Sequence, residues 1–370
     1  MSVEVLNPLK VDVLKLPVRG AMEIVSLTTA ANGHVYGGTT GYRKHLLFSY
    51  NVATGKVQDL GHHVVSAAAI LDKRGREHTQ KIHHALYGCA DGTLVGGTGQ
   101  NVSVSMADFC TSADEGGHVF VYNPATGESR DYGIPVPNEW IINLTVNEKT
   151  RTAYGMTYPL NRFFCVDLDS GKMRIIGQVR GKIGCDSGCC HEMVVDTQGR
   201  VFGSCRGGYF FYYDPALDKL VETDLRLPGG DERIDSLIRH PDGLLYGGTW
   251  ESGHLFSLDT RTMELTDFGS VLGGPRLPAL ALAKDGTIYG AAGGGAQYNT
   301  KRATLFRFTP PQGPIEIMGE IVAENGVAAS RIHSMTMGPD GKLYAGETGS
   351  EEIEAGETGL QPNLFIISPN

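Results

Sequence analysis

PDGLLYGGT, residues 241–249, contains a tight turn followed by an aromatic residue, two glycines and a threonine. Variants of this pattern occur seven times in the chain, at spacings of roughly 43 to 59 residues, which is typical of four-stranded propeller blades. The repeated strands are centred on Tyr36-Gly37-Gly38, Val95-Gly96-Gly97, Tyr154-Gly155, Phe202-Gly203, Tyr246-Gly247-Gly248, Tyr289-Gly290 and Tyr344-Ala345-Gly346. The sequence therefore predicts an all-β fold, a seven-bladed β-propeller.

The repeats also predict the blade boundaries within a single domain that spans residues 1–370. Blades are expected to start near residues 21, 80, 138, 187, 232, 275 and 330. The last repeat supplies three strands, and residues 10–16 alternate like a strand. We expect this N-terminal segment to complete the last blade, because closure of the ring leaves no inner sheet edge unpaired. The glycines after the aromatic residue are expected to let neighbouring blades approach closely near the axis.

The composition restricts the classes of partner. The 370 residues include 50 glycines, only 20% are charged, and the formal net charge is −9. Non-specific nucleic-acid binding needs a basic surface, which a net negative charge argues against. An anionic substrate can still bind to such a protein in a local basic cleft. No apolar run approaches the roughly 18 residues of a membrane span, and the N-terminus lacks the plan of a signal peptide. We expect no nucleic-acid or membrane partner, a monomer, and a cytoplasmic location, or a secreted one if a leader has been trimmed.

Residues at equal offsets from the repeated turns should form rings around the propeller axis. The residues eight before each turn glycine, or its equivalent, are Val25, His84, Asn143, His191, Asp235, Pro278 and His333. They stand at the start of the innermost strand, on the face that usually binds ligands. Polar groups at a channel mouth need water or a ligand as a hydrogen-bond partner. The polar members of this ring are therefore candidate site residues, and a channel that only holds water is the alternative.

A second ring lies four residues beyond each aromatic anchor, at the end of the second strand. It contains Thr40, Gly99, Tyr158, Arg206, Trp250, Gly293 and Thr348. Because this strand runs antiparallel to the first, its end lies on the same face as the first ring. Nearby loops add Asn101 and Tyr298 as candidate binding residues. His83 is a further candidate, but strand alternation directs only one of His83 and His84 inward, and the ring offset favours His84.

Four cysteines are grouped around one of these blades. Cys185, Cys189 and Cys190 precede His191, and Cys205 lies next to Arg206. Zinc takes thiolate and imidazole ligands in a tetrahedron, so this group could hold a structural zinc ion. The spacing is not that of a standard zinc finger, and buried free thiols or a disulfide are the alternatives. The chain has 7 cysteines, so they cannot all pair within it. A divalent ion at the channel mouth is the other possible metal, and no further cofactor is predicted.

The segments KIHHALYGCADGTLVGGTGQN (81–101) and HEMVVDTQGRVFGSCRGGYFFYYD (191–214) resemble the seven-bladed propeller polysaccharide lyases, which include ulvan lyases and related rhamnose–glucuronate lyases. In that family a histidine, a tyrosine and an arginine act on a uronic acid, and some members hold a structural zinc. By blade position, His84 matches the histidine and Arg206 the arginine. The position of the tyrosine holds His191, so the resemblance implies that His191 or Tyr158 takes its role.

The resemblance implies a carbon–oxygen lyase that cleaves a glycosidic bond to a glucuronate-type uronic acid in an anionic oligo- or polysaccharide. Such a β-elimination needs a cation for the substrate carboxylate, a base for the C5 proton and an acid for the leaving oxygen. Arg206, assisted by Asn143 or a histidine, would neutralise the carboxylate, and Trp250 offers a face for sugar stacking. A glycoside hydrolase on the same face, using Asp235 and Glu251, and a non-catalytic propeller that binds a glycan or protein remain alternatives. A metal-dependent lactonase would need more acidic ligands at the axis than Asp235 alone.

Overall fold

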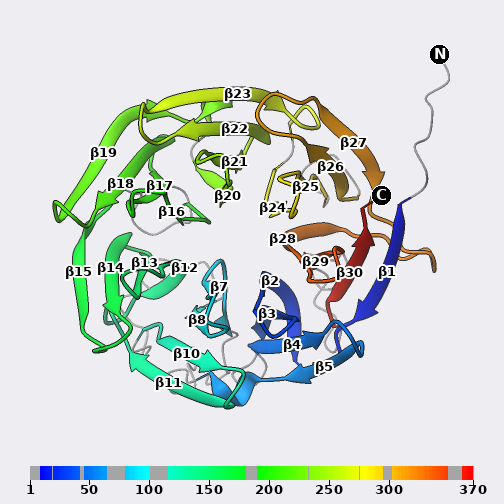
Figure 1. Cartoon of the computed structure of the whole chain (residues 1–370), viewed down its shortest axis with the longest axis horizontal. Helices are drawn as coiled ribbons and strands as arrows, with labels where there is room; N and C mark the ends of the chain where they lie inside the picture. Colours follow the sequence, from blue (N-terminus) through cyan, green and yellow to red (C-terminus); the bar gives the residue numbers. More distant parts are fainter. Residues whose placement is uncertain are drawn as a thin grey trace, which may run out of the picture.

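The computed structural model describes residues 9–18, 20–41, 46–64, 80–100, 116–180, 190–231, 233–274, 276–294, 302–348 and 361–369. Seven β-sheets are arranged around a central axis (Figure 1), which confirms the predicted seven-bladed propeller. Within each blade we call the strands A to D from the axis outward. Neighbouring strands pair antiparallel, so each blade is a meander.

The strands of the first three blades are β2 (Ala21–Thr29), β3 (His34–Gly41), β4 (Leu47–Asn51) and β5 (Lys56–Asp59); β7 (Leu86–Gly88), β8 (Leu94–Gly97), β10 (Val119–Asn123) and β11 (Glu128–Gly133); and β12 (Trp140–Asn147), β13 (Thr152–Tyr158), β14 (Arg162–Asp167) and β15 (Met173–Gln178). Those of the next three are β16 (Val194–Val195), β17 (Val201–Cys205), β18 (Tyr209–Asp214) and β19 (Lys219–Arg226); β20 (Ile234–Arg239), β21 (Leu245–Thr249), β22 (His254–Asp259) and β23 (Glu264–Ser270); and β24 (Ala279–Leu282), β25 (Ile288–Ala292), β26 (Thr304–Phe308) and β27 (Ile315–Glu320).

The seventh blade combines the two ends of the chain. It consists of β28 (Arg331–Met337), β29 (Leu343–Thr348), β30 (Asn363–Ser368) and the N-terminal strand β1 (Lys10–Lys15). Strand β1 pairs antiparallel with β30 over its whole length, and the two lie side by side in Figure 1. The predicted closure by residues 10–16 is confirmed, and it gives the last blade its outer strand.

The second blade departs from the regular plan at its innermost strand. Two short strands, β6 (Gln80–Lys81) and β9 (Gly99–Gln100), pair with each other, and β6 also pairs with the end of β3. Strand A of this blade was expected to run on from residue 80, but residues 82–85 lie between β6 and β7 and belong to neither. This interruption carries His83 and His84, and it decides how both side chains point.

The two glycines of the repeated strand have different neighbours. A Cβ atom on the first glycine would collide with a phenylalanine of strand C in the same blade, at 2.2 Å from Phe48 for Gly37 and 2.3 Å from Phe256 for Gly247. A Cβ atom on the second glycine would collide with the next blade, at 2.5 Å from Leu277 for Gly248. The expected close approach between blades therefore holds for the second glycine. The first glycine makes room for an aromatic ring within its own blade.

Replacing Gly247 with alanine is expected to destabilise the protein by about 1–3 kcal/mol, because an added methyl group in a packed core forces neighbouring atoms to move. The midpoint of urea unfolding measures this. The double variant Gly247→Ala/Phe256→Leu should be more stable than the sum of its two single changes predicts, since the residues share one space. An unchanged midpoint for Gly247→Ala would show that the blade can relax around the methyl group.

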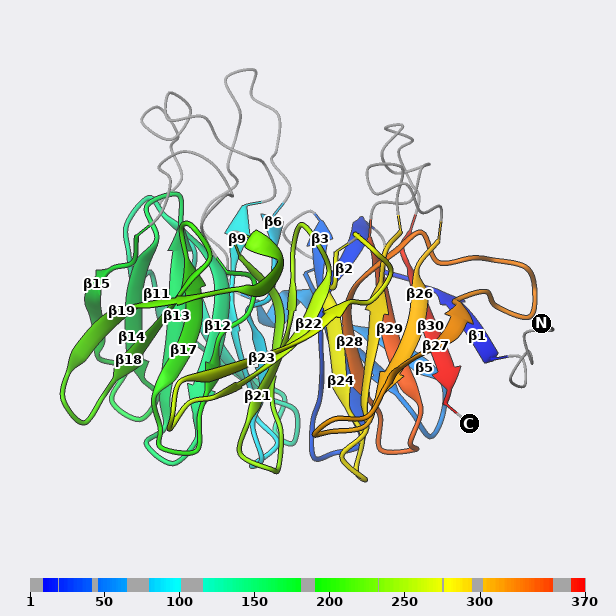
Figure 2. The same ribbon diagram turned by 90° about the horizontal axis from the view of Figure 1, so that it is seen from above.

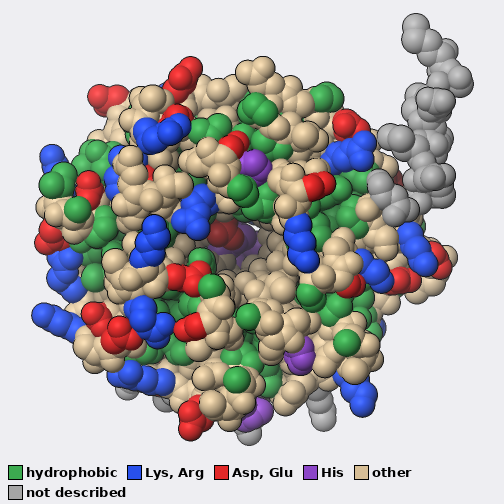
Figure 3. All heavy atoms as spheres, in the orientation of Figure 1, with side chains coloured by type: hydrophobic (Ala, Val, Ile, Leu, Met, Phe, Trp, Pro, Cys, Tyr) green, Lys and Arg blue, Asp and Glu red, His purple; other side chains and the backbone are tan. Residues whose placement is uncertain are grey.

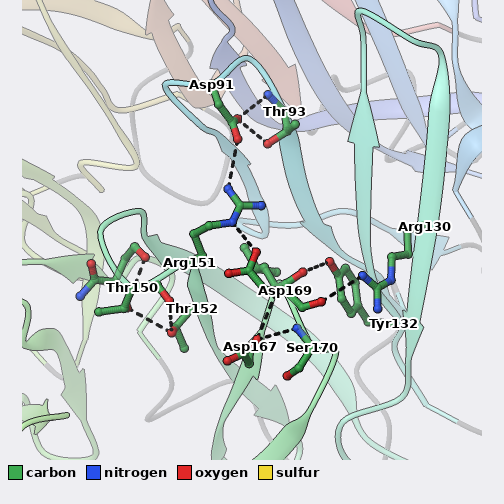
Figure 4. Close-up of polar contacts among 12 residues, drawn as sticks. Asp91, Thr93, Arg130, Tyr132, Thr150, Arg151, Thr152, Asp167, Asp169 and Ser170 are labelled. Atoms are coloured by element: carbon green, nitrogen blue, oxygen red, sulfur yellow. Dashed lines mark hydrogen bonds and ion pairs between the residues drawn. The ribbon is translucent and has the colours of Figure 1, made fainter.

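Polar contacts on the periphery join neighbouring blades. Arg151, in the turn after β12, has Nη1 at 3.2 Å from Asp91 Oδ2 of the second blade and Nε at 2.6 Å from Asp169 Oδ1 (Figure 4). These side chains are about half exposed or more. Exposed ion pairs stabilise by about 0–1 kcal/mol, so packing between the sheets contributes most of the cohesion of the ring.

Helical structure in the described ranges is limited to two 3-10 turns, η1 (Gly61–His63) and η2 (Pro228–Gly230). Among these residues there is accordingly no helix with the length and apolar character needed to cross a membrane. Figure 2 shows the ring from its edge, with the strands of each blade running between its two faces.

Candidate functional site

Four histidine side chains meet at the axis of the ring: His83, His84, His191 and His333. One ring nitrogen from each can be chosen so that all four atoms lie within 4.8 Å of one another, and all four residues are buried. The ring centroid of His84 lies 4.5 Å from that of His83, 5.0 Å from that of His191 and 4.6 Å from that of His333. Three of the four occupy the first predicted ring, and they come from three different blades. We call these residues the histidine cluster.

His83 belongs to the cluster, although strand alternation predicts that it points away from His84. The reason is the interruption of strand A, because side chains alternate only in a regular strand. Hydrogen bonds from two blades hold this segment in place: the Leu144 N–H of the third blade donates to the His84 carbonyl (3.0 Å), and the Gly97 N–H of the second blade donates to the Ala85 carbonyl (2.8 Å). Both histidines of the pair therefore face the axis.

Hydrogen bonds orient two of the four imidazole rings. His83 Nδ1 lies 3.1 Å from the Ile142 carbonyl oxygen, and His84 Nδ1 lies 2.6 Å from Glu192 Oε1. A carbonyl or carboxylate oxygen only accepts, so Nδ1 carries the proton in both rings. In the neutral ring, Nε2 then keeps its lone pair for another partner. His191 Nδ1 lies between two charged groups, 3.1 Å from Asp235 Oδ1 and 3.5 Å from Arg276 Nη2.

Three members of the cluster, His83, His191 and His333, lie in surroundings that favour the neutral ring. Burial is the main cause that lowers the pKa of His83, His191 and His333 well below the usual value, because a charged imidazolium loses its hydration there. Neighbouring cations, including Lys81 beside His83 and His191, act in the same direction. Two buried ring nitrogens, His84 Nε2 and His333 Nδ1, have no hydrogen-bond partner in the described part of the chain. Such groups are costly to bury unless a ligand satisfies them.

Asp235, a member of the predicted ring, forms a buried ion pair. Its two carboxylate oxygens accept hydrogen bonds from Arg276 Nε (2.9 Å) and Nη2 (2.6 Å), and both side chains are almost completely buried. The guanidinium carbons of Arg276 and Arg233 each lie 3.3 Å from the centroid of the Trp250 ring. Trp250 also meets His191 edge to face, at 4.6 Å between centroids. Trp250 thus lies beside the cluster as expected, but arginines cover the ring that was expected to stack on a sugar.

Three arginines next to the cluster were not found by sequence reasoning. Arg233, Arg276 and Arg331 each stand two residues before a member of the first ring: Asp235, Pro278 and His333. The same offset rule, applied two residues earlier, would have found them, because side chains two apart in a strand share a face. Arg331 Nη2 lies 3.4 Å from Thr348 Oγ1, and its buried Nε has no hydrogen-bond partner within the described ranges. Glu192, which directly follows His191, was also missed.

The other predicted residues lie in different surroundings. Tyr158 is buried in a hydrophobic cluster and stacks on Trp140, with 6.3 Å between ring centroids. Arg206 is exposed, and its backbone N–H donates to the Arg180 carbonyl (3.0 Å). Asn143 is fully buried, and its Nδ2 donates to the Cys190 carbonyl (2.6 Å), which ties the third blade to the fourth. The arginines that adjoin the cluster therefore do not include Arg206, which is the arginine that the sequence predicted for the site.

Two of the four cysteines predicted to bind zinc are described. Cys190 and Cys205 are buried free thiols, and burial raises their pKa values to about 12 and about 11. Both are thus protonated at neutral pH in this arrangement. Cys185, Cys189, Asn101 and Tyr298 lie outside the described residues, so the zinc site at the cysteines stays a prediction.

A cavity of about 1140 Å³ reaches the cluster along the axis. His84 and Glu192 lie at its inner end, its walls include Leu86, Leu144 and Leu237, and its rim includes residues of the A–B turns such as Asn147, Gln198 and Pro241. Figure 3 shows a hollow at the centre of the ring, with histidine and acidic side chains at its inner end. The cluster thus lies between this cavity and the arginines, which are nearer to the start of strand A.

Comparison with solved structures shows the propeller fold. The chain is similar to a streptogramin B lyase (TM-score 0.67, 13% identity, covering 99% of this chain and 100% of the other). It is also similar to a catalytically inactive virginiamycin B lyase from Staphylococcus aureus solved with quinupristin (TM-score 0.64, 12% identity, 98% and 100% covered). A third similar structure is an extracellular domain of a one component system from B. thetaiotaomicron (TM-score 0.60, 13% identity, 98% and 40% covered).

No protein-family model matches the sequence, and no curated protein does. At 12–13% identity the likeness to solved structures extends to the fold alone. The similar structures include lyases and proteins with other roles, and no comparison identifies a polysaccharide lyase.

Proposed function

We propose that the protein is a carbon–oxygen lyase that cleaves a glycosidic bond to a uronic acid by β-elimination at the histidine cluster. The observation that carries this proposal is the position of four buried imidazoles directly beside arginines. Elimination breaks the C5–H and C4–O bonds, forms a C4–C5 double bond, and delivers a proton to the leaving oxygen. It therefore needs a proton acceptor and a cation for the carboxylate at the same place.

Arg331 takes the role that was expected of Arg206. Its buried Nε keeps a hydrogen bond available, and the residue stands on the strand that carries His333. Arg276 is already neutralised by Asp235, which leaves Arg331 as the better partner for a substrate carboxylate. Donors aimed at charge that develops in the transition state are worth about 10²–10³-fold in kcat.

The histidine cluster accepts the C5 proton, directly or through a water bound there. His84 is the best-placed member, because Glu192 orients its ring and stabilises a positive charge on it. General-base catalysis of this kind contributes about 10²–10⁴-fold. A hydrolase is less well supported, since it needs two available carboxyl groups and Asp235 is buried in its pair with Arg276.

Two of the similar structures are of lyases, a streptogramin B lyase and a virginiamycin B lyase, which supports elimination chemistry on this fold. The compound solved with one of them, quinupristin, is not a polysaccharide. The choice of a uronate therefore rests on the arginines, on the buried imidazoles and on the resemblance of residues 81–101 and 191–214 to the propeller polysaccharide lyases.

Incubation with rhamnose–glucuronate, ulvan and pectic oligosaccharides is expected to produce unsaturated uronates, detected by ultraviolet absorbance and by products one water lighter than those of hydrolysis. Arg331→Gln should lower kcat/KM by about 10²–10³-fold. The exposed Arg302, which pairs with Glu320, provides the control variant Arg302→Gln. Saturated products would indicate a hydrolase, and no product from the folded protein on any uronate would contradict the proposal.

A further inference from the structure

We infer that the histidine cluster binds one divalent transition-metal ion through ring nitrogens of His83, His84, His191 and His333. This inference stands on the geometry of the cluster. A bound ion would occupy the free lone pair of His84, so the C5 proton of the proposed elimination would then pass to water bound at the cluster and not to His84 itself.

The four candidate nitrogens lie near the spacing that one shared ion requires. In a tetrahedral zinc site with bonds of about 2.0–2.1 Å, two ligand nitrogens lie about 3.4 Å apart. The four candidate nitrogens all lie within 4.8 Å of one another. Binding of one ion therefore requires the widest pair to close by about 1.4 Å at most.

The outer partners of the rings match those of metal-bound histidines. A metal-ligating histidine almost always donates its other ring N–H to a carboxylate or a backbone carbonyl, which fixes the orientation of the ring. Two members of the cluster do so, His83 to the Ile142 carbonyl and His84 to Glu192. A carboxylate oxygen of Asp235 also lies 3.1 Å from His191 Nδ1. Ordinary packing of four histidines would not require this arrangement.

Charge and hydrogen bonding also favour an ion here. His84 Nε2 and His333 Nδ1 are buried without a hydrogen-bond partner among the residues described, and a shared ion would satisfy both. The carboxylates of Glu192 and Asp235 adjoin two of the rings and offset the positive charge of an ion. Neutral imidazoles are the form of histidine that binds metals.

The ligand set indicates the class of metal. Imidazole nitrogens suit zinc, copper, iron and nickel, whereas magnesium and calcium prefer oxygen ligands. A late first-row divalent ion is therefore expected, and millimolar Mg²⁺ or Ca²⁺ should not displace it. Such an ion would lie beside Arg331, where it could polarise an anionic ligand.

The full chain, stripped with a chelator, should bind one Co²⁺ or Zn²⁺ ion per molecule, measured by the Co²⁺ absorption spectrum and by elemental analysis. His333→Ala should weaken binding by about 100-fold or more, and Glu192→Gln by about 10–100-fold. His254, which pairs with Asp267 on the outside of its blade, provides the control variant His254→Ala. The variant Cys190→Ser distinguishes a metal site at the histidine cluster from one at the cysteines. Both controls should bind like the wild type.

Circular dichroism establishes that each variant is folded, and anomalous scattering from crystals of the wild-type protein with Co²⁺ locates the ion if His333→Ala does not fold. The inference is overturned if the folded wild type binds neither ion, if the ion lies at the cysteines, or if a folded His333→Ala keeps its affinity. Metal binding without any elimination activity would contradict the lyase proposal and leave this inference standing.

Discussion

Replacement of Asp235 with alanine is expected to lower the free energy of unfolding by about 3–5 kcal/mol, because it leaves Arg276 buried and unpaired. The pair is bidentate, and the side chains of Asp235 and Arg276 are 0% and 3% exposed. Loss of the carboxylate also removes the negative charge that lies 3.1 Å from His191 Nδ1. Urea unfolding followed by tryptophan fluorescence and circular dichroism measures the change.

The double variant Asp235→Leu/Arg276→Met provides the matching test, because it removes both charges and keeps apolar volume. It should be clearly more stable than Asp235→Ala, since replacing a whole buried ion pair is often neutral. Glu320→Ala, which breaks the exposed pair with Arg302, should cost no more than about 1 kcal/mol. Equal stability losses in Asp235→Ala and Glu320→Ala would show that the axial pair is not desolvated.

His84→Ala is expected to lower kcat/KM for elimination by about 10²–10⁴-fold, with little effect on the free energy of unfolding compared with Asp235→Ala. The ring of His84 contacts the other three members of the cluster and is oriented by Glu192. Its loss removes either the proton acceptor or a metal ligand. Initial rates of double-bond formation measure the effect.

His254→Ala is the control for this change, because His254 pairs with Asp267 on the outside of its blade. Added imidazole should restore part of the activity of His84→Ala if the missing ring acts as a base or a ligand. A His84→Ala protein with wild-type kcat/KM would remove the histidine cluster from the reaction.

The number of blades, their approximate boundaries and the closing strand could all be predicted from residue spacing. Two blades show the same local contact: the carboxylates of Asp242 and Asp340 in the turn each accept a hydrogen bond from the tyrosine hydroxyl four residues later, at 3.0 Å from Tyr246 and 3.1 Å from Tyr344. Local patterns of this kind depend on neighbours in the chain, so they are visible without a structure. The double role of the paired glycines was only half predicted, because Phe256 approaches Gly247 from another strand.

The candidate site was predicted less completely. Equal offsets placed His84, His191 and His333 on one ring, and the structure brings them together. The same rule did not anticipate that strand A is interrupted at residues 82–85, which adds His83 to the cluster. Nor did it separate Arg206 from Arg331, since both stand near strand ends and only burial distinguishes them.

The sequence by itself determined the architecture, because a repeat of turn, aromatic residue and glycine specifies one blade and its copies specify the ring. Only the tertiary structure decided which polar residues act together. Side chains from the second, fourth and seventh blades, which are far apart in the chain, meet at the axis. The tautomers of His83 and His84 depend on the Ile142 carbonyl and on Glu192. Burial then decides which histidines are neutral and which arginine keeps a hydrogen bond for a ligand, and burial is a property of the closed ring.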